Sequence, residues 1–332
     1  MDGNAFSPLS CTLLHTRSSS TPMKSVLVTG GAGFIGSNLT LELQRRHPEA
    51  WIVVMDDFRS GDFKNLEGFK GDCIAANVAE VDFSKRFREG SFDAIFHLAS
   101  ITDTTDHDQF KQVHNNVEGF RNLLQWAEKD QIPIVYASSA ATYGKSESIM
   151  DEECTPSPQN VYGFSKVQLD HLCGYYRGQH PAWNLVGLRY FNVYGPREAH
   201  KGHMASMIYQ LFLQMKAGKK PRIFEDGNQK RDFVYVKDVV DVTLAALVAP
   251  VSGVYNAGSG ASASFNQVIE GLNRALELSL DIEYFENPYT FYQNFTQADI
   301  SKARKDLNYE PVFDLDRGIN DYVRWLLREE NA

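Results

Sequence analysis

The sequence predicts an α/β protein in which a doubly wound parallel β-sheet precedes a smaller α/β lobe. From residue 23 to about residue 191, short apolar runs alternate with amphipathic segments. The runs are nearly continuous, which is typical of parallel strands that helices cover on both faces. After Gly195 the rhythm becomes irregular, and this change indicates the second lobe.

The predicted elements follow from these runs in chain order. Strands of the first domain are expected at residues 24–29, 51–55, 94–97, 132–137 and 185–191. In the second lobe we expect a helix at 204–216, short strands at 221–225 and 254–256, and a helix starting where Ser264 and Gln267 have capping-box spacing. The first domain is therefore placed at 23–191 and the second lobe mainly at 192–332. Residues 1–22 read as a disordered extension or an expression remnant.

The composition is that of an ordinary globular protein, and it disfavours several classes of function. The 332 residues carry a formal charge of −9, whereas binding to nucleic acid needs a basic surface. Four cysteines are scattered without a C-x-x-C pair, so we expect neither disulfides nor a metal site and place the protein in a reducing cytoplasm. No apolar run approaches the roughly 20 residues that span a bilayer, so no membrane partner is expected.

The segment VTGGAGFIGSN, residues 28–38, carries the first chemical signal. Gly30, Gly33 and Gly36 lie between a strand and an amphipathic helix, where missing side chains let a pyrophosphate reach backbone amides at the helix start. The second strand ends in Asp56 and Asp57, at the usual distance for an acid that binds the adenosine ribose. This pattern predicts a Rossmann-type domain that binds a dinucleotide.

The phosphate state of that dinucleotide stays open on these residues. An acid at the end of the second strand favours NAD, while a nearby cation accepts the 2′-phosphate of NADP. Both kinds of residue are present, because Arg59 and Lys64 follow Asp56 and Asp57.

The second signal combines Ser139 with Tyr162 and Lys166. The tyrosine and lysine are four residues apart, so on a helix they share one face. An ammonium there can hold the nicotinamide ribose and lower the pKa of the phenol, which would make Tyr162 an acid or base near neutral pH. Ser139 is expected to end the preceding strand and to hydrogen-bond the same substrate oxygen.

Three segments, TGGAGFIG, SSAATYG and YGFSK, together resemble the extended short-chain dehydrogenase/reductase enzymes that act on nucleotide sugars. The resemblance runs from Met23 to about Arg328. It implies a seven-stranded parallel sheet and a C-terminal lobe that grips the sugar nucleotide. Three further segments, RYFNVYGPREAHKGHMAS, FEDGNQKRDFVYVKDV and FYQNFTQAD, are similar to the branch of that family that epimerises C6 of ADP-linked heptoses.

This resemblance implies an activity and its partners. The cofactor, expected to be NADP, oxidises C6 of the heptose to a ketone, and the same hydride returns to the opposite face. The ADP-heptose product serves lipopolysaccharide core synthesis in this branch, and its members are homo-oligomers, namely pentamers.

The same resemblance assigns site residues one by one. Tyr162 matches the first acid/base, and Lys201 in the G-P-R-E-x-x-K segment matches the second; without the resemblance Lys201 reads as an exposed loop cation. The cofactor positions add Phe34, Ile35, Asn115 and Val193 to the residues named above. The substrate positions fall on Asn192, His203, Gln210, Phe224, Glu225, Asp226, Gly227, Arg231 and Tyr292.

Arg231 is the most persuasive of the substrate residues on chemistry alone. Its guanidinium is shaped to bind a pyrophosphate through two parallel hydrogen bonds. The alternative is an ion pair with the adjacent Asp232 or another acid.

The sequence departs from the branch at two places. Asp57 replaces the asparagine that is common there, and a second carboxylate repels a 2′-phosphate, which weakens the expectation of NADP in favour of NAD. His203 stands where the branch usually has a small polar residue, and Gln210 stands where it usually has a histidine; these differences affect fine substrate specificity.

Three other functions are alternatives to the heptose epimerase. A nucleotide-sugar 4,6-dehydratase would need an Asp-Glu pair after Ser139, where this chain has Ala140 and Ala141. A UDP-hexose 4-epimerase shares the glycines, Ser139 and the Tyr-Lys pair but has no need of Lys201. A non-catalytic dinucleotide-binding regulator would not require Ser139, Tyr162 and Lys166 together.

Overall fold

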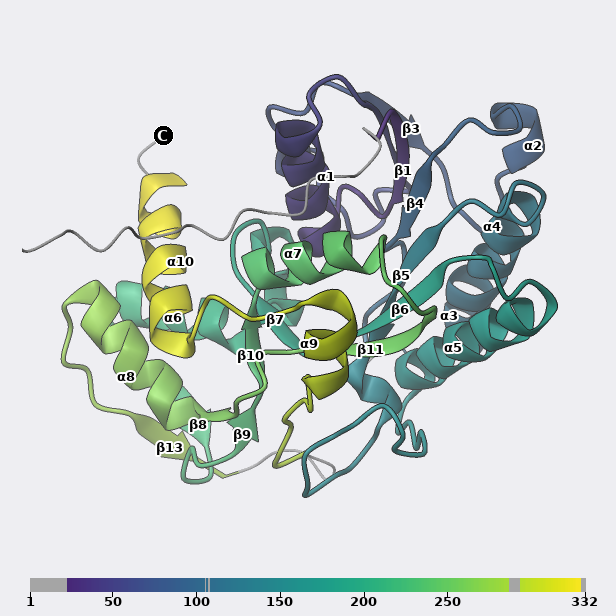
Figure 1. Cartoon of the computed structure of the whole chain (residues 1–332). Coiled ribbons are helices and arrows are strands. Elements are labelled where there is room, and N and C mark those ends of the chain that lie inside the picture. Colours follow the sequence, from purple (N-terminus) through teal and green to yellow (C-terminus); the bar gives the residue numbers. More distant parts are fainter. Residues whose placement is uncertain (1–22, 105, 107, 287–292, 330–332) are drawn as a thin grey trace, which may run out of the picture.

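A computed structural model describes residues 23–104, 106, 108–286 and 293–329 (Figure 1). Its centre is a sheet of seven parallel strands in the order β11-β6-β5-β4-β1-β2-β3. The doubly wound parallel sheet and its strand number are therefore confirmed. The strands are β1 (Ser25–Thr29), β2 (Trp51–Asp56), β3 (Asp72–Ala75), β4 (Ala94–His97), β5 (Ile134–Ser139), β6 (Leu185–Tyr190) and β11 (Gly253–Ala257).

Helices cover both faces of this sheet (Figure 1). One face carries α1 (Phe34–Arg46) and α7 (Val236–Ala246), and α9 (Ser301–Leu307) packs beside α7 near the β11 edge. The other face carries α3 (Gln109–Val113), η2 (His114–Glu118), α4 (Gly119–Ala127) and α5 (Val161–Gln179). The short elements η1 (Phe63–Leu66), α2 (Phe83–Arg86) and η3 (Ala140–Thr142) lie in the connections.

The first strand shows why its sequence is continuously apolar. Val26 and Val28 belong to the hydrophobic core on one face of the sheet, whereas Leu27 belongs to the core on the other. All three side chains are fully buried. Successive residues of a strand point to opposite faces, so a strand covered on both sides needs apolar residues at every position.

The smaller lobe has its own core of aromatic and aliphatic side chains, which come from its helices and from its strands. Its helices are η4 (Ala199–Met204), α6 (Met207–Lys216), α8 (Phe265–Leu276) and α10 (Leu315–Glu329). Its strands form three pairs: β7 (Asn192–Tyr194) with β10 (Phe233–Tyr235), β8 (Arg222–Phe224) with β13 (Glu283–Phe285), and β9 (Lys230–Arg231) with β12 (Ala263–Ser264). No helix in the described part of the chain is long and apolar enough to cross a bilayer.

Two elements of the second part differ from the sequence prediction. The strand expected at 254–256 was placed in the smaller lobe, but β11 pairs with β6 at the edge of the main sheet. The helix expected from residue 204 begins at Met207, because Ser206 caps it by accepting a hydrogen bond from the Tyr209 amide. The capping box at Ser264 and Gln267 is confirmed. The predicted domain boundary stays a prediction.

Candidate active site

The glycine-rich turn after β1 forms a cradle without side chains. Gly30 has φ +72°, and a Cβ there would lie 2.5 Å from the backbone nitrogen of Ala99. A Cβ on Gly36 would lie 2.0 Å from the Gly30 carbonyl oxygen. Gly33 is the N-cap of α1 and offers no capping side chain, so the first amides of this helix are available to an anion. These features fit the pyrophosphate of a dinucleotide.

Asp56 and Asp57, at the end of β2, make different contacts. The Asp56 carboxylate accepts hydrogen bonds from the amides of Ala32 and Phe58, at 2.9 Å each, and burial raises its pKa. Asp57 instead pairs with Arg59 at 3.1 Å. The Arg59 guanidinium also donates to the Asn115 side-chain oxygen, at 3.1 Å. Asp56 therefore shapes the glycine-rich turn, while Asp57, Arg59 and Asn115 form a polar rim at the adenosine end expected for the cofactor.

Ser139 ends β5, and Tyr162 and Lys166 lie one turn apart on α5, as the sequence predicts. The Lys166 ammonium donates to the Ala137 carbonyl at 2.8 Å and lies 5.6 Å from the centre of the Tyr162 ring. Burial lowers the pKa of Lys166 to about 7, although Asp170 opposes the shift. The three side chains thus form one compact group.

The expectation that Lys166 lowers the pKa of Tyr162 is wrong for this structure. Burial raises the pKa of Tyr162, and the effect that opposes it comes from the Ser139 side chain. Lys166 directs its ammonium to Ala137, and burial makes its own charged form costly. The phenol therefore favours its protonated form in the protein alone.

Lys201 belongs to a loop that leaves the main sheet and enters the smaller lobe. Its ammonium lies 5.5 Å from the centre of the Phe34 ring, at the start of α1. Burial lowers its pKa, and Glu198 opposes this shift. The half-buried Lys201 is therefore not the exposed loop cation that the sequence alone suggests.

The two lobes are joined next to Lys201 by asparagine side chains of the larger domain. Asn38 on α1 donates to the Pro196 carbonyl at 2.9 Å. Asn65 on η1 donates to the Ala32 carbonyl in the glycine-rich turn and contacts the ring Nδ1 of His200, both at 2.9 Å. The loop that carries Lys201 is thus attached to the turn that is expected to hold the cofactor.

These groups meet in one cavity of about 620 Å³ at the carboxyl ends of the parallel strands. A cavity of this size suits a dinucleotide and part of a second ligand. Every predicted catalytic and cofactor residue lines it: Ser139, Tyr162, Lys166, Lys201, Gly30, Gly33, Phe34, Ile35, Gly36, Asp56, Asp57, Arg59, Asn115 and Val193.

The predicted substrate residues lie elsewhere, on the smaller lobe. His203 and Gln210 contact one another, because the Gln210 amide donates to the backbone carbonyls of His203 and Ala205. Arg231 is buried, and its guanidinium lies 5.8 Å from the centre of the Phe265 ring. The described members of this group that do not line the cavity are Asn192, His203, Gln210, Phe224, Glu225, Asp226, Gly227 and Arg231. Tyr292 lies outside the described residues.

The alternative reading of Arg231 as the partner of Asp232 is not favoured by the acid's contacts. The Asp232 carboxylate accepts hydrogen bonds from the backbone amides of Ser259, Gly260 and Ala298 and from the Ser259 hydroxyl. These bonds stabilise a fully buried acid at the junction of the lobes.

Sequence reasoning missed several residues that line the cavity. The loop after β4 contributes Leu98, Ser100 and Asp103, and the loop before Lys201 contributes His200. The rule that ligands bind at the carboxyl ends of parallel strands points to the residues after β4, since the prediction placed that strand correctly. His200 had only its position beside Lys201 as a signal.

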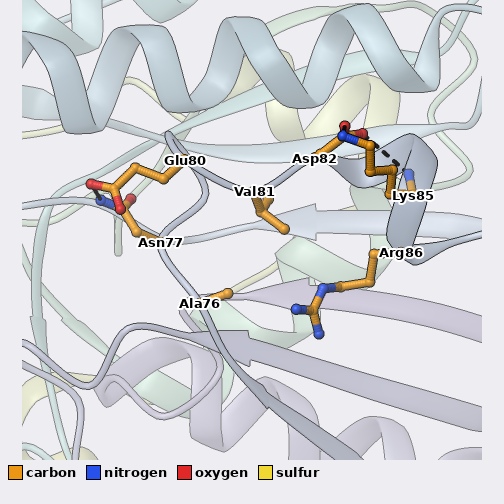
Figure 2. Close-up of a pocket in the computed structure, with 7 residues that line it drawn as sticks. All are labelled: Ala76, Asn77, Glu80, Val81, Asp82, Lys85 and Arg86. Atoms are coloured by element: carbon orange, nitrogen blue, oxygen red, sulfur yellow. Dashed lines mark hydrogen bonds and ion pairs between the residues drawn. The ribbon is translucent and has the colours of Figure 1, made fainter.

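A second hollow, of about 640 Å³, adjoins this site at Ala76 and Asn77, which line both (Figure 2). Figure 2 shows three of its four charged side chains in contact with near neighbours: Lys85 pairs with Asp82, and Glu80 accepts a hydrogen bond from Asn77. None of the predicted site residues that the structure describes lines this hollow. The chemistry is therefore concentrated in the first cavity.

Comparison with known proteins places the chain among nucleotide-sugar enzymes. Residues 26–258 match the NAD dependent epimerase/dehydratase family. The structure resembles ADP-L-glycero-D-manno-heptose-6-epimerase from Helicobacter pylori, with 42% sequence identity, a TM-score of 0.85, and coverage of 92% of this chain and 97% of that one.

Two 4-epimerases are also similar to this chain. UDP-glucuronic acid 4-epimerase from Bacillus cereus, in complex with NAD and a fluorinated UDP-sugar, has 30% identity, a TM-score of 0.80, and coverage of 91% and 99%. UDP-glucose 4-epimerase from Thermotoga maritima, with UDP-glucose, has 26% identity, a TM-score of 0.85, and coverage of 92% and 99%.

Proposed function

The chain belongs to the NAD dependent epimerase/dehydratase family, and on this premise we propose that it epimerises C6 of ADP-D-glycero-D-manno-heptose. As a member it is an enzyme of the nucleotide-sugar epimerase type. The product is ADP-L-glycero-D-manno-heptose, and the proposed place of the reaction is lipopolysaccharide core precursor synthesis. The likeness to the Helicobacter pylori enzyme supports this substrate.

The observation that carries the proposal is the position of Lys201. It lines the same cavity as Ser139, Tyr162 and Lys166, although it comes from the loop that enters the smaller lobe. Epimerisation through a ketone needs proton transfer at the substrate oxygen in two orientations, because the hydroxyl points differently in the two epimers. Two separate acid/base groups in one cavity meet this requirement.

A nicotinamide dinucleotide, which the glycine-rich turn, Arg59 and Asn115 would hold, would supply the hydride acceptor and donor for the chemistry at C6. Tyr162 exchanges a proton with the C6 oxygen in one epimer, and Lys201 does so in the other. The Ser139 hydroxyl hydrogen-bonds this oxygen. Burial lowers the pKa of Lys201, which makes it a better base partner than a free lysine, and raises the pKa of Tyr162, which favours its protonated form.

The cofactor is a nicotinamide dinucleotide, and we propose NADP. The glycine cradle supports a dinucleotide, and Arg59, which lines the same cavity, supplies a guanidinium of the kind that binds a 2′-phosphate. The competing choice is NAD, since Asp57 already pairs with Arg59 and adds negative charge. We further propose that the working protein is a homo-oligomer, a pentamer.

The test of this function uses the purified holoenzyme. Denaturation releases the dinucleotide for identification by mass, and the enzyme is assayed on ADP-D-glycero-D-manno-heptose beside UDP-galactose. We expect conversion of the heptose. Conversion of UDP-galactose alone would favour the UDP-hexose 4-epimerase instead, and absence of both activities with dinucleotide bound would favour a non-catalytic regulator.

A further inference from the structure

The loop from Gly195 to Ser206 is closed at its neck by the side chain of Glu198. One carboxylate oxygen accepts the Gly195 amide at 3.1 Å and the Ser206 hydroxyl at 2.8 Å. The other accepts the Ser206 amide at 2.5 Å. Glu198 has no exposed surface, so these bonds are formed away from water and define both ends of the loop.

The backbone of this loop adopts a conformation that needs such support. Arg197 has φ +70°, in the left-handed region that costs a non-glycine residue about 1 kcal/mol or more. Gly202 has φ +54° and interrupts the short helix that contains Lys201. Lys201 sits between these two positions, and its amide donates to the Glu198 carbonyl at 3.0 Å. Lys201 is therefore held in the loop by contacts that all involve Glu198.

The charge of Glu198 also acts on Lys201. Burial raises the pKa of Glu198, and the amides of Ser206 and Gly195 and then the charge of Lys201 oppose this shift. The titratable groups that interact with this pair include His200 on the loop, Tyr209 on α6 and Tyr322 on α10. Asp56, Tyr162 and Lys166 line the same cavity as Lys201, and Lys166 donates to the Ala137 carbonyl at 2.8 Å.

We propose that Glu198 is a positioning residue for Lys201. Its buried carboxylate closes the Gly195–Ser206 loop by accepting hydrogen bonds at both ends, which holds Lys201 at the cavity, and its negative charge favours the charged form of Lys201. This inference rests on the proposed function, because it gives Glu198 a role through the second acid/base.

The experiment compares pH profiles of kcat for the full-length holoenzyme and its variants on ADP-D-glycero-D-manno-heptose. Lys201→Met first identifies the limb of the profile that depends on Lys201. Glu198→Gln removes the charge, so this limb should move to lower pH because Glu198 raises the pKa of Lys201. We expect kcat at neutral pH to fall about tenfold while KM and the amount of bound dinucleotide stay within about twofold.

Two further variants separate position from charge. Glu198→Asp keeps the charge but shortens the side chain that joins Gly195 to Ser206, so the limb should stay in place while kcat falls about tenfold. Asp238→Asn is the matched control, since Asp238 is another buried carboxylate that accepts backbone amides, from Val312 and Phe313. It should change the denaturation midpoint and leave the limb where it is.

The outcomes separate the inference from the function beneath it. The inference would be overturned if Glu198→Gln had the kcat of the wild type and the same pH profile. It would also be overturned if this variant lost activity while the limb of its pH profile stayed at the wild-type pH, since that result marks a purely structural role. If Glu198→Gln does not fold, Glu198→Asp decides: wild-type kcat in that variant overturns the inference. Normal turnover in Lys201→Met would instead overturn the proposed second base.

Discussion

The cavity has two walls that are built differently. The cofactor wall comprises the glycine-rich turn, the end of β2, Ser139, Tyr162 and Lys166, and the ends of regular strands and helices hold these residues. The substrate wall is the Gly195–Ser206 loop, which contains a non-glycine residue with positive φ and depends on Glu198. The comparison teaches that one wall is positioned by the sheet itself, whereas the other is positioned by a few buried side chains.

The largest expected effect comes from breaking the cofactor wall at Tyr162. Tyr162→Phe keeps the ring but removes the hydroxyl, so turnover should fall by about 10²-fold or more, the range for a positioned acid or base. Bound dinucleotide and circular dichroism should be unchanged, because Tyr162 lines the cavity and is not part of a hydrophobic core cluster. A variant with near-normal kcat on ADP-heptose would remove Tyr162 from the mechanism.

The matching change in the substrate wall is Lys201→Met. It preserves much of the side-chain volume and should lower kcat by about 10²-fold, with the fold intact. Lys219→Met, at an exposed lysine just after α6, is the control and should retain full activity. If Lys201→Met epimerised ADP-heptose at the normal rate, only the cofactor wall would contain catalytic residues.

A smaller effect distinguishes the walls by their response to acid. His97 ends β4, its ring contacts the Thr29 hydroxyl at 2.8 Å, and burial lowers its pKa to about 3. Below about pH 6.5 the His97 ring binds a proton in the unfolded chain but stays neutral in the folded protein. The free energy of unfolding therefore decreases as pH falls from about 6.5 towards 3. We expect the folding equilibrium to weaken up to about tenfold per pH unit in this window from His97 alone.

Urea denaturation between pH 7 and pH 5 measures this contribution. His97→Gln removes the titrating ring, so the free energy of unfolding should depend less on pH in the variant than in the wild type. Equal pH dependence in the two proteins would show that His97 does not make the folding equilibrium sensitive to acid.

The smallest expected effect concerns the choice of dinucleotide. Asp57→Asn removes the partner of Arg59 and a charge that repels a 2′-phosphate, so the ratio of NADP to NAD affinity should rise about three- to tenfold. Both side chains are partly exposed, which keeps the effect modest. Glu42→Gln, which breaks ion pairs on α1 with Arg45 and Arg46, should leave the ratio unchanged. Isothermal titration with each dinucleotide measures it.

The difference between the walls also explains what the sequence predicts. Gly30, Ser139, Tyr162 and Lys166 are fixed by their distance from a strand end or a helix turn, and these local rules place them in the cavity. Lys201 has no such rule, and its assignment depended on the resemblance to a family. Its pKa is changed by burial, and its ammonium lies 5.5 Å from the ring centre of Phe34, a long-range contact that no local spacing reveals.

The errors have physical causes of the same kind. The strand at 254–256 is short and apolar, and nothing local says whether it joins the main sheet or the lobe; its pairing with β6 decides. The shift of the Tyr162 pKa could not be predicted because it depends on how deeply the helix start is buried. The acids after β2 are adjacent in sequence, yet Asp56 binds backbone amides while Asp57 binds Arg59.

The most direct test of the central claim, that the two walls form one epimerisation site, is the fate of the hydrogen on C6. ADP-D-glycero-D-manno-heptose carrying deuterium at C6 is converted by the holoenzyme in ordinary water, and the product is analysed by mass and NMR. We predict that the L-glycero product retains the deuterium at C6, because the same hydride leaves and returns within the closed cavity. Replacement of the deuterium by solvent hydrogen, or no conversion of this substrate, would contradict the account.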